Sequence, residues 1–130
     1  MLKFYDLPRG SGKTTRIEEE MKLDKNAIVI VPTRANKSDS SAEERTYTVR
    51  EVLHGSLDSV SFSQIFIDEL FLSEYEKMAL LWKLGGYKKD VSVYHTSSMA
   101  LTAHLKEVES LGWEKADTLY KKYRHVISFQ

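Results

Sequence analysis

The 130-residue chain carries 19 basic and 19 acidic side chains and no cysteine. This length predicts one domain, residues 1–130, large enough to bury a hydrophobic core. The charge balance gives no global attraction to a polyanion, and the absence of cysteine excludes disulfides, thiolate zinc sites and a cysteine nucleophile. No apolar run reaches membrane-spanning length, so we expect a cytoplasmic protein without membrane contact.

The stretch from Asp6 to Thr15, DLPRGSGKTT, has the composition of a phosphate-binding loop. Its glycines let the backbone close around an anion, and the helix that follows presents unpaired N–H groups. Lys13 is spaced to reach the β- and γ-phosphate oxygens, and Thr14 can place its hydroxyl on Mg²⁺. The alternative is a glycine turn that caps an ordinary helix. The predicted nucleotide-binding residues are Pro8, Arg9, Gly10, Ser11, Gly12, Lys13, Thr14 and Thr15.

One position departs from the GxxxxGK[ST] pattern of such loops. Leu7 stands where the first glycine is usual. That glycine eases the turn out of the preceding strand, and Pro8 already fixes one φ angle nearby. We therefore expect an altered entry to the loop and a retained phosphate cradle.

A second candidate motif is IFIDE, residues 65–69, a short apolar run that ends in two acids. Such a run is typical of a buried parallel strand, whose carboxyl end is where ligands lie in open α/β sheets. Asp68 is predicted to hold Mg²⁺ through water, and Glu69 to act as the general base that activates the attacking water. The alternative is an exposed acidic turn after a core strand.

Strands and helices alternate along the rest of the chain. Expected strands cover residues 2–5, 27–31, 46–49, 65–69, 91–94 and 125–129. Expected helices cover residues 15–23, 73–85, 101–111 and 116–124, with a short turn at 50–55 and a polar surface loop at 32–45. We predict a three-layer α/β sandwich around a mainly parallel sheet of about five strands, with the active site at the carboxyl ends of the strands.

Apolar spacing predicts which helix faces are buried. Tyr75, Met78, Ala79 and Trp82 form one stripe, which we expect in the core, and Ser73 with Glu76 resembles a capping box before it. Leu101, Leu105, Val108 and Leu111 form a second stripe, in a helix stopped by Gly112.

With both motifs in place, the chain resembles P-loop NTPases of the RecA-like branch, in which an extra strand lies between the Walker A and Walker B strands. Three weaker patterns are similar to the first ATPase core of helicases and of terminase packaging motors: VPTR at 31–34, TYTVREVLHG at 46–55 and YHTSS at 94–98. In the last of these, Thr96 and Ser97 match a sensor of the γ-phosphate. The resemblance implies Mg²⁺-dependent binding and hydrolysis of ATP or another NTP, linked to nucleic-acid handling.

Such motors complete their sites with an arginine from a second core or another subunit, worth on the order of a thousandfold in turnover. This chain has no room for a second core, so we expect that it turns over slowly alone, borrows an arginine from another copy or a partner, or binds nucleotide without hydrolysing it. The candidates are Arg34, Arg45, Arg50 and Arg124. The run Tyr120–Arg124 could contact nucleic acid, although the solvated face of a helix is the plainer interpretation.

Two other functions share these features. A small nucleoside or nucleotide kinase has the same loop and size, and thymidine-kinase-like proteins also follow an IDE strand. Many of those carry a cysteine zinc site that this chain lacks. The third hypothesis is a regulatory or assembly module that binds nucleotide without turning it over.

Overall fold

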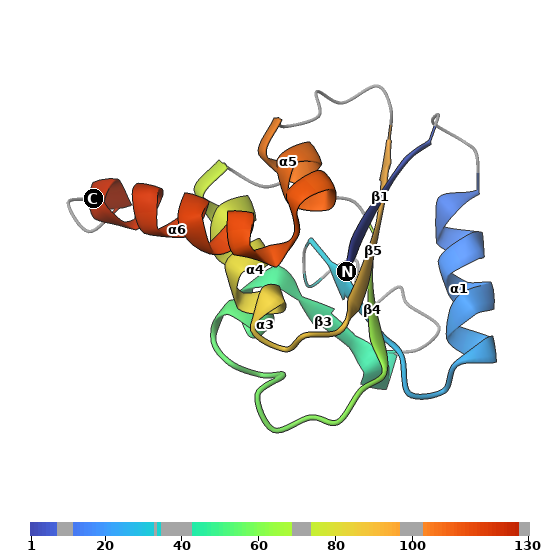
Figure 1. Cartoon of the computed structure of the whole chain (residues 1–130). Helices are drawn as coiled ribbons and strands as arrows, with labels where there is room; N and C mark the ends of the chain where they lie inside the picture. The colour runs from blue at the N-terminus through green and yellow to red at the C-terminus, as the bar shows by residue number, and fades with distance from the viewer. Residues whose placement is uncertain (8–11, 33, 35–42, 69–73, 97–102, 128–130) are drawn as a thin grey trace.

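Helices cover both faces of a five-stranded, all-parallel sheet in the computed structural model of the chain (Figure 1). The structure describes residues 1–7, 12–32, 34, 43–68, 74–96 and 103–127, some of them, including Lys13 and Thr96, by backbone alone. The three-layer α/β arrangement and the parallel sheet predicted from the sequence are confirmed.

The strands are β1 (Leu2–Leu7), β2 (Ile28–Val31), β3 (Thr46–Thr48), β4 (Gln64–Asp68) and β5 (Asp90–Thr96). Their order across the sheet is β1-β5-β4-β2-β3. Strand β5, which comes after the other four in the sequence, therefore lies between β1 and β4. In this register Tyr94 of β5 pairs with Tyr5 on one side and with Asp68 on the other.

The helices are α1 (Lys13–Leu23), α3 (Val49–Leu53), α4 (Glu74–Gly85), α5 (Ala103–Leu111) and α6 (Trp113–Ile127), with a 3₁₀ turn, η1, at Glu43–Arg45. Helix α1 lies on one face of the sheet, and α3 to α6 lie on the other (Figure 1). No described helix is long and apolar enough to cross a membrane.

Alternating strand side chains fill two cores. Ile65 and Ile67 of β4 point into the larger core, under α3 to α6, whereas Phe66 belongs to the smaller core under α1. This alternation is the two-residue period of a strand buried on both faces. On the α1 side, Ile17 and Met21 are each 3% exposed, as the spacing of α1 predicts.

Asp24 joins the end of α1 to the start of β4. Its carboxylate accepts hydrogen bonds from Ser63 Oγ at 2.6 Å and Gln64 Nε2 at 2.8 Å, and from the backbone N–H of Asn26. These hydrogen bonds hold the pKa of Asp24 below its usual value, with a smaller contribution from the Arg45 charge.

The predicted strand at 125–129 is wrong. Residues 125–127 continue α6, and residues 128–130 lie outside the described part of the chain. The β-branched Val126 and Ile127 suggested a strand, but their intrinsic preference against helix is small, and adding residues to a helix that already runs from Trp113 needs no new nucleus.

One predicted core position is also wrong. Trp82 is 41% exposed, whereas Leu80, Leu81 and Leu84 are buried. Helix α4 lies between the sheet and α6, so it buries a wider face than a single stripe provides. Ala79 is buried as predicted; the side chains of Tyr75, Met78, Leu101 and Leu105, the Ser73 cap and most of the 32–45 loop lie outside the described part.

Candidate functional site

The carboxyl ends of β1, β5 and β4 reach the edge of the sheet where α1 begins (Figure 1). Gly12 is the residue before α1 and has φ +78°, the left-handed region that glycine adopts without strain. Its carbonyl accepts the first helical hydrogen bond, from Arg16 N at 3.0 Å. Within the described residues no side chain caps this end of the helix, and its first turn holds no acidic residue, so the positive end of the helix dipole meets no carboxylate of that turn.

Thr14 and Asp68 meet at this edge. The Thr14 hydroxyl donates a hydrogen bond to Asp68 Oδ2 at 3.1 Å, although the two residues are 54 positions apart in the sequence. Thr14 is exposed in the first turn of α1, and Asp68 is the half-buried last residue of β4. The fold thus brings together one residue from each of the two predicted motifs.

The pair fits a magnesium ion in chemistry. Hydroxyl and carboxylate oxygens suit Mg²⁺, directly or through a bound water. The 3.1 Å distance puts the two oxygens close enough together to serve one hydrated ion. The described residues include no group of three or more acidic, histidine or cysteine side chains that could hold a metal ion by themselves. A nucleotide-bound Mg²⁺ needs only one or two protein ligands, because phosphates and water supply the rest.

The place of Leu7 explains the missing first glycine. Leu7 is the last residue of β1, in extended backbone, and packs against the smaller core under α1. A side chain at this position therefore finds a place in the protein, and no left-handed backbone is required.

Two tyrosine rings stack on each other on the neighbouring strands β1 and β5, a feature that the sequence pattern did not single out. The rings of Tyr5 and Tyr94 lie 4.9 Å apart at an angle of 17°. Burial raises the pKa of Tyr94, and nearby Tyr5 and Glu20 raise it further while Arg16 opposes them. Tyr5 and Tyr94 each end a predicted strand, at residues 2–5 and 91–94, and this shared position is the sequence signal for the stack.

The remaining predicted site residues lie wholly or partly outside the described structure. Pro8, Arg9, Gly10 and Ser11 of the loop, the predicted base Glu69 and the predicted sensor Ser97 are not described. Lys13 begins α1, and Thr96 ends β5 opposite Leu7 of β1. Thr15 is exposed next to Thr14.

Arg45 has a structural role that the sequence did not suggest. Its guanidinium donates hydrogen bonds to the carbonyl oxygens of Met21, Asp24 and Ala27 at 3.0–3.1 Å. These carbonyls lie at the end of α1 and before β2, at the opposite end of α1 from Thr14. In this structure the Arg45 guanidinium is therefore engaged within the chain. Arg34 and Arg50 are exposed, and the side chain of Arg124 is not described.

The basic-aromatic run in α6 contributes to helix packing. The Tyr120 ring stacks on Trp82 of α4 with centroids 4.5 Å apart, and Lys121 Nζ lies 2.9 Å from Asp117 Oδ2. One face of the Tyr120 ring is therefore occupied within the protein. The side chains of residues 122–124 are not described.

No protein-family model matches this sequence, and no curated protein matches it significantly.

Proposed function

We propose that the chain is a Mg²⁺-dependent nucleotide-binding protein of the P-loop, RecA-like type that hydrolyses ATP or another NTP. The observation that carries this proposal is the 3.1 Å hydrogen bond between Thr14 and Asp68. In P-loop NTPases the loop Ser/Thr and the acid at the end of the second motif strand hold the Mg²⁺ together. The strand order gives further support, because β5 lies between the two motif strands.

Each residue has a distinct task in this proposal. The first-turn amides of α1 and Lys13 bind the phosphates, while Thr14 and Asp68 hold the metal. When bound, Mg²⁺ neutralises charge on the phosphate oxygens. Glu69 orients the attacking water and accepts its proton. Helicase-like or packaging-type work on nucleic acid, with an arginine supplied by another copy or a partner, is the form of this function that the motif patterns favour.

Thr14 offers the sharpest test. Thr14→Val keeps the shape of the side chain and removes the hydroxyl, whereas Thr14→Ser keeps the hydroxyl. Calorimetric titration with ATP should show tighter binding with Mg²⁺ than with EDTA in the wild type and in Thr14→Ser. Thr14→Val should lose most of that Mg²⁺-dependent gain, about tenfold for one metal ligand. Thr118→Val, which makes the same change at an exposed position of α6, is the matched control. An equal gain in Thr14→Val and wild type would refute the metal role of Thr14.

Turnover needs a separate measurement. Phosphate release from Mg·ATP should depend on Lys13, so that Lys13→Ala serves as the blank. Glu69→Gln should bind nucleotide and release no phosphate. Specific activity that rises with protein concentration would indicate that copies complete one another's sites. Nucleotide binding without phosphate release at every protein concentration would indicate a nucleotide-binding module. Transfer of label from ATP to an added nucleoside would indicate a kinase.

A further inference from the structure

The amino edge of the sheet, where the strands start, carries a row of lysines. It lies at the opposite end of the strands from the edge where α1 begins. Lys88 and Lys89 directly precede β5, and Lys3 lies near the start of β1. Lys22 is in the last turn of α1, and Lys25 lies between α1 and β2. All five residues are exposed, and we call them the amino-edge lysines.

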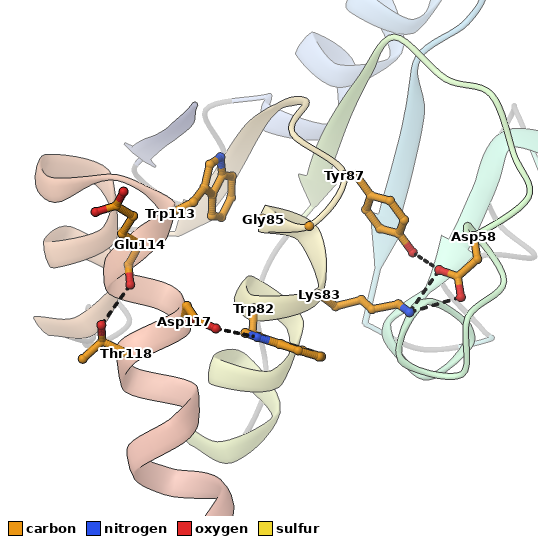
Figure 2. Close-up of a pocket in the computed structure, with 10 residues that line it drawn as sticks. Asp58, Trp82, Lys83, Gly85, Tyr87, Trp113, Glu114, Asp117 and Thr118 are labelled. Carbon is orange, nitrogen blue, oxygen red and sulfur yellow. Dashed lines mark hydrogen bonds and ion pairs between the residues drawn. The ribbon is translucent and has the colours of Figure 1, made fainter.

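Neighbouring carboxylates do not neutralise these lysines. None of the five forms an ion pair within the described part of the chain. Of the carboxylates at this edge, Asp90 pairs with the amino group of Met1 at 3.1 Å, and Asp24 is hydrogen-bonded to the start of β4. By contrast, Lys83 at the end of α4 lies 3.0 Å from Asp58 (Figure 2). The amino edge is therefore a local excess of positive charge in a chain whose total charge is balanced.

Lys88 occupies a backbone position that suits glycine better. Its φ is +57°, the left-handed region, and no other described non-glycine residue has a positive φ. This region costs a residue with a Cβ about 1–2 kcal/mol, whereas glycine adopts it freely. The turn itself thus gives no reason for a lysine here. A contact made by the side chain would give one.

A polar groove opens at the same edge, on the α1 side of the sheet. It occupies about 350 Å³, at the lower end of the range of ligand pockets, and residues of α1, β1, β4 and β5 line it. Lys3 belongs both to the lysine row and to the lining of the groove. The lining also includes side chains that donate and accept hydrogen bonds, among them Glu20, Gln64, Ser92 and Tyr94.

We propose that the amino edge binds single-stranded nucleic acid, with phosphates on the amino-edge lysines and one base in the groove. Strands β1 and β2 lie three strand spacings apart, so the row is about 14 Å long and spans about four phosphates of one strand. Ammonium groups bind phosphates as point charges, and the polar lining of the groove suits the hydrogen-bonding edge of an unpaired base. The inference rests on the nucleic-acid part of the proposed function and not on hydrolysis. Its test contains no nucleotide, so its failure would leave the metal and turnover tests unaffected.

Fluorescence anisotropy of a labelled oligothymidylate measures the binding. At low salt the signal should saturate. The logarithm of the association constant should fall against the logarithm of the salt concentration with a slope of about −3, as expected for about four phosphates of a single strand. An abasic strand of the same length keeps the phosphates and has no base for the groove. It should bind about tenfold more weakly.

Two double variants with the same change in net charge locate the surface. Lys88→Gly with Lys89→Gln should weaken binding at least about tenfold at low salt and should make the salt slope shallower by about 1.4. Glycine at position 88 relieves the left-handed strain, so this variant should keep the Tm of the wild type. The control, Lys115→Gln with Lys121→Gln, removes two positive charges from α6 and should change the affinity less than about twofold.

Three results would overturn the proposal: no saturable binding of the oligothymidylate at low salt, equal affinity for the abasic strand, or equal weakening by the two double variants. Vesicles of phosphatidylserine and phosphatidylcholine test a second anionic partner, because Met1 and Leu23 at this edge are 69% and 82% exposed. A bilayer surface would leave the polar groove unfilled. Cosedimentation with these vesicles, together with no binding of the oligothymidylate, would assign the edge to a lipid surface.

Discussion

Replacing Arg45 with methionine should lower the free energy of unfolding by about 3 kcal/mol. The guanidinium donates to three backbone carbonyls, of Met21, Asp24 and Ala27. A hydrogen bond contributes about 1 kcal/mol net, and more when the donor is charged, although partial exposure of Arg45 reduces the gain. Methionine keeps the apolar stem and leaves the carbonyls without these donors. A loss of this size lowers the Tm by about 10 °C in a chain of this length.

Urea unfolding, monitored by circular dichroism, measures the change. Arg45→Lys should recover about 1 kcal/mol, because one ammonium on a straight stem cannot match a fork that reaches three carbonyls. Arg50→Met, at an exposed position of α3, is the control and should change stability by less than about 0.5 kcal/mol.

A loss below about 1 kcal/mol in Arg45→Met would refute the structural role of this arginine. The same variant addresses catalysis. If Arg45→Met abolished phosphate release while its unfolding curve stayed unchanged, Arg45 would act on nucleotide, and its carbonyl contacts would be incidental.

Two smaller effects follow from side-chain caps. The folded-state pKa of Asp24 lies below its ordinary value of 3.8, so its stabilising effect is present above that pH and is lost as the pH falls through the folded-state pKa. Asp24→Asn should therefore lower the Tm at neutral pH, and the difference in Tm between this variant and the wild type should disappear in acid. A difference in Tm that does not change with pH would contradict this. Thr48 Oγ1 accepts from Glu51 N at 3.1 Å, and Glu51 Oε1 accepts from Thr48 N at 3.0 Å. Thr48→Ala should cost about 1 kcal/mol in urea unfolding, and an unchanged midpoint would exclude the capping box.

The sequence identified the candidate site because both motifs are local. Gly12 directly precedes a helix that Lys13 and Thr14 begin, and Asp68 ends an apolar run. Such patterns are legible in a single sequence because a phosphate loop and a buried strand each depend on neighbouring residues. The five strands of the sheet were predicted on the same basis, from short apolar runs and, at residues 46–49, from alternation, together with a sixth at 125–129 that is helix where it is described.

Tertiary packing decided what neighbouring residues do not determine. The position of β5 between β1 and β4, and with it the 3.1 Å approach of Thr14 to Asp68, depends on how crossovers pack across the sheet. Periodicity alone placed Trp82 in the core, yet it is 41% exposed, with one face of its ring stacked on Tyr120 of α6. Side-chain spacing predicts which faces of an element are apolar, whereas burial depends on which other element arrives to cover them.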